Sequence, residues 1–90
     1  MKKEQVRSKI EEYGDAIVTY RSEKSKKLKY NVVTLDFSSE YIQTKRTHAR
    51  ENEHTVLTFS WDTDSFRLIN APLVTSVVPL NSVLKNKTHD

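Results

Sequence analysis

One short segment combines aromatic rings with carboxylates, the side chains in this sequence best suited to ligand chemistry. Residues 59–66 read FSWDTDSF. Asp62 and Asp64 flank a single residue, so they could in principle work as an acid–base pair. Catalytic carboxylates, however, need a pocket that shifts one of the two pKa values. Because Asp, Thr and Ser are common turn residues, we interpret the two acids as turn residues or ligand-facing groups.

Other catalytic and metal-binding chemistry lacks the residues that it needs. His48, His54 and His89 have no metal-ligand spacing to one another, and the chain has no cysteine. Gly14 is the only glycine, which excludes a glycine-rich phosphate loop. No serine has the context of a nucleophile elbow. We therefore expect a protein that is not an enzyme and that has no metal site and no cofactor.

Positive charge is concentrated in two short stretches, although the net charge is only +3. The basic residues of these stretches are Lys24, Lys26, Lys27 and Lys29 in the first, and Lys45, Arg46 and Arg50 in the second. Basic clusters attract phosphate, so nucleic acid is a candidate partner. The alternative is a pair of solvated loops that resist aggregation.

The length of the chain, 90 residues, predicts one domain with a modest core. A chain of this size buries roughly 60–65% of its unfolded surface, which leaves little room for a deep cavity. Residues 1–4 lack the apolar run of a signal peptide, and no apolar stretch approaches the length of a membrane span. The absence of cysteine fits an intracellular protein. We expect a soluble, intracellular domain without a membrane partner.

The N-terminal residues have the spacing of a short helix. Val6, Ile10 and Tyr13 recur at helical intervals between charged residues, which predicts a helix over 2–12. Gly14 follows, and glycine is common just past a helix end. Residues 1–13 are therefore expected to form an N-terminal helix or an extension.

From Asp15 onward the hydrophobic period changes to two, which is typical of strands. The predicted strands cover 16–20, 28–37, 55–61, 66–69 and 76–80. The expected connections are a charged turn at 21–27, a long polar loop at 43–54, a tight turn at 62–65 and a short turn at 72–74, with a flexible tail at 81–90. A bulge is expected near Val32 and Val33.

These elements predict a mainly β fold. No strand–helix–strand alternation appears, which argues against a parallel nucleotide-binding sheet. About five short antiparallel strands within 14–80 fit a small barrel, because a barrel closes its own edges. The fold class is therefore a five-stranded barrel preceded by a short N-terminal helix.

The order of these features resembles a Tudor domain, and more broadly the SH3-like barrels of the chromatin-reader group, with their chromo-barrel and PWWP relatives. The resemblance covers 14–80. It rests on Gly14-Asp15 before the first strand, a charged turn, Tyr30 in a long strand, the run VLTFSWDT at 56–63, and a short helical turn before Val78-Pro79-Leu80. It implies an SH3-like barrel, a nuclear location and a protein partner such as a histone tail.

The resemblance also implies candidate ligand-binding residues. Family members that bind methylated Lys or Arg hold the cation in an aromatic cage. The matching aromatic positions are Tyr20, Tyr30, Phe59 and Trp61. Asp62 or Asp64 matches the polar residue that holds the ligand's charge. A methylated ammonium is a weakly hydrated cation, and each ring face is worth roughly 0.5–2 kcal/mol to it.

The same rings could instead form the core of the barrel. Phe59 lies between Thr58 and Ser60, an alternation that favours a core position. Leu35, Phe37 and Phe66 are assigned to the core. Trp61 stands at a strand end, where exposure is expected.

Three functions stay open. The first is a Tudor-like reader or adaptor that recognises a methylated or unmodified peptide in chromatin. The second is a nucleic-acid-binding SH3-like barrel that uses the two basic stretches, with Trp61 stacked on a base. The third is a protein–protein scaffold without a methyl cage, in which an edge strand pairs with a partner's peptide.

Overall fold

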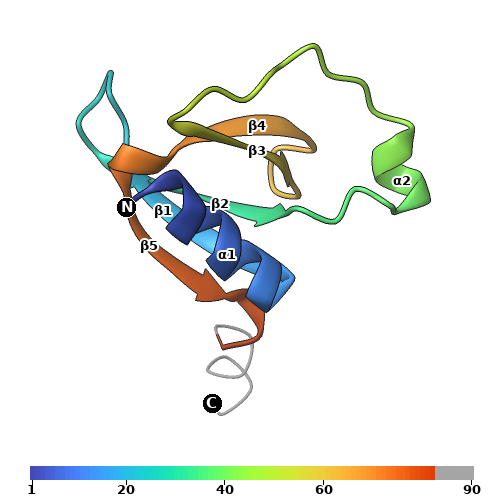
Figure 1. The fold of residues 1–90 in the computed structure, drawn as a ribbon, viewed down its shortest axis with the longest axis horizontal. Coiled ribbons are helices and arrows are strands. Elements are labelled where there is room, and N and C mark those ends of the chain that lie inside the picture. The colour runs from blue at the N-terminus through green and yellow to red at the C-terminus, as the bar shows by residue number, and fades with distance from the viewer. Residues whose placement is uncertain (83–90) are drawn as a thin grey trace.

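Helix α1 spans Lys3–Tyr13 in the computed structural model, which describes residues 1–82 of the chain. Its Val6 and Ile10 lie one turn apart and are both fully buried in the main core. Gly14 ends the helix with a φ of +80°, and its N–H donates to the carbonyl of Ile10. Figure 1 shows α1 lying across the sheet, so the predicted helix is an integral part of the fold.

The sheet is built from five antiparallel strands. They are β1 (Asp15–Arg21), β2 (Leu28–Thr34), β3 (Thr55–Ser60), β4 (Ser65–Asn70) and β5 (Val74–Pro79). Their order is β4-β3-β2-β1-β5, so the first four strands form a meander and β5 returns to pair with β1 (Figure 1). A one-turn 3-10 helix, η1 (Ala71–Leu73), precedes β5. The mainly β class, the N-terminal helix and the short turn before the last strand are confirmed.

Three expectations about the sheet need correction. β4 and β5 are the two ends of the strand order, so the sheet is open and does not close its edges within residues 1–82. The irregularity in strand pairing lies between Thr19 and Tyr20, where β1 meets β5, and not at Val32 and Val33. The last strand begins at Val74 rather than at 76. The predicted tail falls largely on residues 83–90, which lie outside the described residues.

The second strand is shorter than its hydrophobic pattern predicted. It ends at Thr34, because local side chains capture the next backbone groups. The Asp36 N–H donates to Thr34 Oγ1, and the Ser38 N–H donates to Asp36 Oδ1, both at 3.1 Å. Such side-chain–backbone bonds compete with strand pairing. The chain then forms a short helix, α2 (Glu40–Gln43), that the sequence pattern did not predict.

The two faces of the sheet are covered by different groups of apolar residues. The main core joins α1 to the inner face of the sheet, through residues such as Val18, Val33 and Val56. Phe59 lies an odd number of residues from Val56, so its side chain projects from the opposite face. Segment 35–43 covers that face, where Ile42 is buried as well. Figure 1 shows α2 beside the β3–β4 hairpin, away from α1.

Candidate functional site

Three of the six predicted cage residues meet at one hollow in the surface. Tyr20, Tyr30 and Asp62 all line a shallow cavity of about 360 Å³ between the start of β2 and the β3–β4 turn. Leu28, Lys29, Asn31, Thr63 and Arg67 complete its lining. A second hollow of about 280 Å³ shares Tyr20, Lys29, Asn31 and Arg67 with the first. We call the surface formed around these four shared residues the inner groove.

Asp62 is occupied by hydrogen bonds that brace the turn against β2. Its carboxylate accepts the Val32 N–H at 3.0 Å, the Asn31 side-chain amide at 3.2 Å and the Ser60 hydroxyl. Asn31 is only 3% exposed, and its own amide oxygen accepts the Tyr20 hydroxyl at 2.9 Å. Burial acts to raise the pKa of Asp62, but the donors from Ser60, Val32 and Asn31 outweigh it and hold the pKa below its usual value.

Removing this carboxylate should weaken the domain in a pH-dependent way. A folded-state pKa below the unfolded value of about 3.9 stabilises the fold above that pH, and the contribution is lost as the pH falls through the folded pKa. Asp62→Ala leaves the Asn31 amide without this acceptor, so we expect a loss of about 1–3 kcal/mol at neutral pH. Urea unfolding at several pH values measures it.

The control for that experiment is Thr63→Ala, a change at an exposed neighbour in the same turn. It should alter stability by no more than about 0.5 kcal/mol. The difference in the free energy of unfolding between the native protein and Asp62→Ala should become smaller below a pH of about 4. If this difference in the free energy of unfolding stays constant down to strongly acidic pH, the role assigned to the ionised carboxylate is contradicted.

The other predicted cage residues do not reach the hollow. Phe59 is 0% exposed, and its ring packs against those of Tyr41, Trp61 and Phe66 at centroid distances of 6.4, 5.2 and 5.4 Å. It has no surface to offer a ligand, so its assignment to a cage wall is wrong and its core assignment holds. Trp61 is 40% exposed, and its indole N–H donates to Asp15 Oδ1 at 3.0 Å.

Asp64 belongs to the contact between the β3–β4 turn and the segment after β2. It accepts the Tyr41 hydroxyl and pairs with Lys45 Nζ at 3.0 Å. The hydrogen bond from Tyr41 has the larger effect on the pKa of Asp64, and together with the one from Lys45 it holds that pKa below its usual value. The six cage candidates therefore divide into two groups: Tyr20, Tyr30 and Asp62 line the hollow of about 360 Å³, and the other three lie elsewhere.

The first basic stretch borders the inner groove, whereas the second lies on another loop. Lys24 lines one hollow and Lys29 lines both. Lys26 and Lys27 stand on the exposed turn between β1 and β2. Lys45 is paired with Asp64, and Arg46 and Arg50 are exposed on the loop that leads to β3.

Sequence reasoning missed several contributors to this surface, among them Leu28, Asn31 and Arg67. Leu28 is 56% exposed and lies beside Tyr30, which is 64% exposed. Arg67 projects to the same side as the buried Ile69, two residues along β4. The period-two pattern of β4 therefore contained the signal that places Arg67 on the inner face.

The backbone of β2 has a free edge beside the hollow. β3 pairs with β2 only at Val33 and Thr34. The Val32 N–H and C=O both bond away from β1, to Asp62 and to the Trp61 N–H. In an antiparallel pair this orientation repeats at every second residue, so the N–H and C=O groups of Tyr30 and Leu28 also point away from β1. None of the hydrogen bonds found within residues 1–82 uses these four groups.

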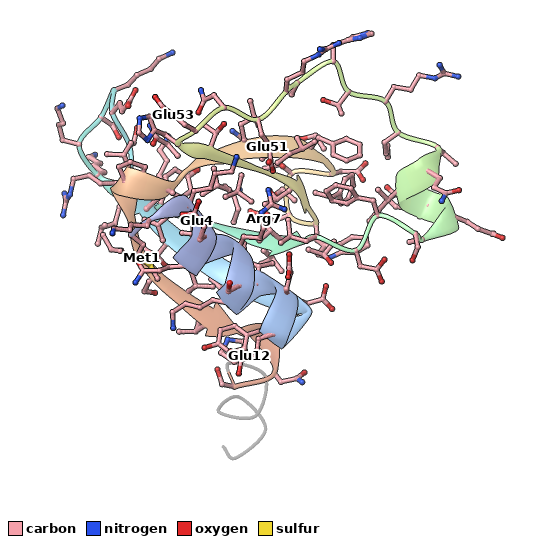
Figure 2. The ribbon with its side chains drawn as sticks, viewed as in Figure 1. Met1, Glu4, Arg7, Glu12, Glu51 and Glu53 are labelled. Atoms are coloured by element: carbon pink, nitrogen blue, oxygen red, sulfur yellow. The ribbon has the colours of Figure 1, made fainter. Side chains whose placement is uncertain are left out.

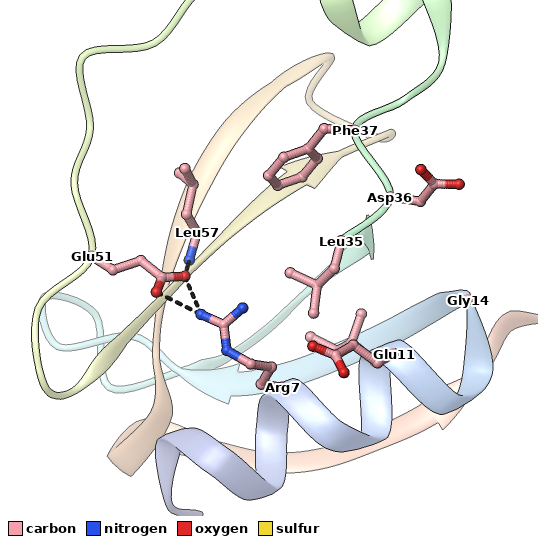
Figure 3. A pocket seen from close by; sticks show the side chains of 9 residues that line it. Arg7, Glu11, Gly14, Leu35, Asp36, Phe37, Glu51 and Leu57 are labelled. Carbon is pink, nitrogen blue, oxygen red and sulfur yellow. Dashed lines mark hydrogen bonds and ion pairs between the residues drawn. The ribbon is translucent and has the colours of Figure 1, made fainter.

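Another hollow, of about 450 Å³, lies between α1 and β3 (Figure 3). Glu51 closes one side, because its carboxylate accepts the Arg7 guanidinium and the Leu57 N–H and pairs with Lys3 at 3.2 Å. Figure 2 shows Arg7 and Glu51 facing one another. Burial acts to raise the pKa of Glu51, but the Leu57 N–H, Lys3 and Arg7 lower it overall. These contacts tie the long loop to the helix and to β3, which is a structural role.

Two further observations concern metal binding and membrane spans among the described residues. Within 1–82, no group of His, Cys, Asp and Glu side chains is arranged to hold a metal ion. In the same part of the chain, no helix has the length and apolar character needed to cross a bilayer.

Comparisons with known proteins add no relative to these observations. No family model, no curated protein and no solved structure matches the chain. The likeness to Tudor and other SH3-like domains therefore remains a prediction that rests on the sequence pattern of 14–80.

Proposed function

We propose that this domain is a non-enzymatic binding module that takes up an extended peptide as an added strand along the free edge of β2. The observation that carries the proposal is the set of unpaired backbone groups at Leu28 and Tyr30. Unpaired strand edges are templates for pairing with another chain. Peptide recognition by strand addition uses such edges.

The free edge of β2 differs from the edge that β5 forms at one end of the sheet. It opens onto a hollow, and two large exposed side chains, Leu28 and Tyr30, stand beside it. β5 ends at Pro79, which has no N–H to donate. An added strand at β2 would therefore gain side-chain contacts as well as backbone hydrogen bonds, each worth about 0.5–1.5 kcal/mol net.

The proposal includes the finer fold assignment and its setting. A four-stranded meander, a one-turn helix before β5 and the return of β5 to β1 support an SH3-like barrel that stays open beside β2. A chromatin peptide in the nucleus is the partner that this resemblance implies. Recognition of a methylated side chain finds less support, because Phe59 is buried and both Asp62 and Asp64 are already hydrogen-bonded.

A pair of substitutions at Tyr30 tests strand addition. Tyr30→Ala removes the ring and keeps the backbone N–H, whereas Tyr30→Pro removes both. Because this N–H points away from β1, proline at this position leaves the β1–β2 hydrogen bonds in place. The probes are three capped peptides of about eight residues, in which Val alternates with Glu, Gln or Lys.

Amide-shift titrations give the readout. We expect at least one peptide to shift the amides of 28–32 and to show intermolecular contacts to β2. Tyr30→Pro should weaken that binding roughly tenfold more than Tyr30→Ala, since it removes a backbone donor as well as the ring. Equal affinities for the two variants, with both shown folded by thermal melting, would contradict strand addition.

Nucleic-acid binding is the second candidate, and the cations of the inner groove favour it. Lys24, Lys29 and Arg67 line the hollows, and the exposed Tyr30 ring could stack on a base. This binding would weaken steeply with salt. Lys26→Glu with Lys27→Glu, which reverses the charge of the neighbouring turn, would abolish it.

A further inference from the structure

The charges around the inner groove indicate which peptide the free edge of β2 would accept. We infer that the added strand carries acidic side chains at alternate positions, which face Lys29, Arg67 and Lys24. This inference deepens the proposed function and rests on it. It identifies the partner by its chemistry, as an extended segment in which acidic and apolar residues alternate.

The first step is the placement of the cations relative to β2. Lys29 and Asn31 share the inner face with the core residue Val33, because they lie four and two residues before it, respectively, on one strand. Tyr20 shares that face on β1 and packs against the main core. Arg67 reaches the same groove from β4. A peptide strand beside β2 would therefore point every second side chain toward these cations.

The second step is the balance of charge within the groove. Four cations and two carboxylates line its two hollows: Arg21, Lys24, Lys29, Arg67, Glu23 and Asp62. Within residues 1–82, the side chains of Lys24, Lys29 and Arg67 take part in none of the ion pairs or hydrogen bonds found. Both carboxylates already accept hydrogen bonds, Glu23 from the Asn70 amide and Asp62 from three donors. With four cations against two carboxylates, the groove keeps an excess of positive charge.

The third step concerns the peptide side chains that would point away from the cations. Leu28 and Tyr30 project from the outer face of β2, on the same side as Val32. Side chains of the peptide that alternate with the acidic ones would lie next to these exposed apolar groups. β-Branched residues suit such positions, because they combine strand preference with apolar contact. The expected pattern is therefore an acidic residue followed by a β-branched one, repeated.

The backbone groups at the free edge favour a peptide over a nucleic acid. The carbonyls of Leu28 and Tyr30 need N–H donors, which a peptide strand supplies at the matching spacing. A phosphodiester backbone supplies only acceptors, so it could accept from the N–H groups of Leu28 and Tyr30 but could not satisfy their carbonyls. The inner groove and the free edge together therefore select an acidic peptide.

The experiment compares the three alternating peptides, with Glu, Gln or Lys, by amide-shift titration of the whole chain. The Glu peptide should bind roughly 5–20-fold more tightly than the Gln peptide, since each new pair at a partly exposed site contributes modestly. The Lys peptide should bind most weakly. The preference for Glu should shrink as the salt concentration rises, because exposed charges are screened.

Two variants assign that preference to particular cations. Lys29→Gln combined with Arg67→Gln should bring the Glu and Gln peptides to nearly equal affinity. Arg46→Gln combined with Arg50→Gln is the matched control, because it removes the same charge from the exposed loop before β3. The control should keep most of the preference for Glu.

The possible failures are distinguishable. Equal binding of the Glu and Gln peptides by the native chain would overturn the inference and leave strand addition standing. If a Glu peptide methylated at alternate backbone nitrogens binds as tightly as the unmodified one, strand addition itself is wrong. Tighter binding of a single-stranded oligonucleotide to the same amides would replace the acidic peptide with a nucleic acid as the ligand.

Discussion

Replacing Phe59 by alanine is expected to destabilise the domain by about 3–5 kcal/mol. The ring is 0% exposed and contacts three other aromatic rings, so its removal leaves a cavity beneath segment 35–43. Small domains have total stabilities of about 5–15 kcal/mol, so this loss is a large fraction of the whole. Urea unfolding followed by the fluorescence of Trp61 measures it, since that ring lies 5.2 Å from Phe59.

Tyr30→Ala is the control for Phe59→Ala, because it also removes one aromatic ring but from a side chain that is 64% exposed. Its stability should change by about 0.5 kcal/mol or less. Phe59→Leu keeps an apolar group in the site, so its loss of stability should lie between those of Phe59→Ala and Tyr30→Ala. It remains measurable if the alanine variant does not fold. Equal stabilities for Phe59→Ala and Tyr30→Ala would show that Phe59 is not a core residue and would reopen the cage assignment.

Ile10→Ala is expected to cost about 2–5 kcal/mol, although it lies in the N-terminal helix. Ile10 is fully buried and belongs to the main core together with Val33 and Val56 of the sheet. Helices of this length are marginal in water by themselves, so α1 and the sheet depend on this contact. Urea unfolding gives the stability, and far-ultraviolet circular dichroism reports whether helix and sheet unfold together.

Glu12→Ala is the matched control on α1, at an exposed position on the same helix. It should change the free energy of unfolding by about 0.5 kcal/mol or less. If Ile10→Ala changed the free energy of unfolding as little as Glu12→Ala, α1 would be an extension that contributes little to the stability of the domain. A separate early transition for the helix would lead to the same conclusion.

Most elements of the fold were predictable from local patterns. The helical spacing of Val6 and Ile10, the period-two runs and the turn residues at 62–65 correspond to α1, to the strands and to the β3–β4 turn. Pro72 marked the short turn before β5. These signals are readable because each depends on residues only a few positions apart.

The burial and the contacts of the cage candidates were not predictable from local patterns. Asp62 and Asp64 have the same residue type and nearly the same sequence context, yet one binds Asn31 and the other binds Tyr41 and Lys45. Phe59 is covered by segment 35–43, which read as a strand end and an irregular stretch. Side-chain partners that lie 19–31 residues away are chosen by tertiary packing, which no local pattern encodes.

The sequence by itself determined the residue types of the segment 59–66, the helix, the strands and the concentration of lysine before and within β2. Only the tertiary structure decided that β3 leaves β2 after Val33 and Thr34. The turn at Asp62 caps Val32, so the strand pairing cannot continue toward Tyr30 and Leu28. Strand register is set by long-range packing and turn geometry, and it alone creates the free edge on which the proposed function rests.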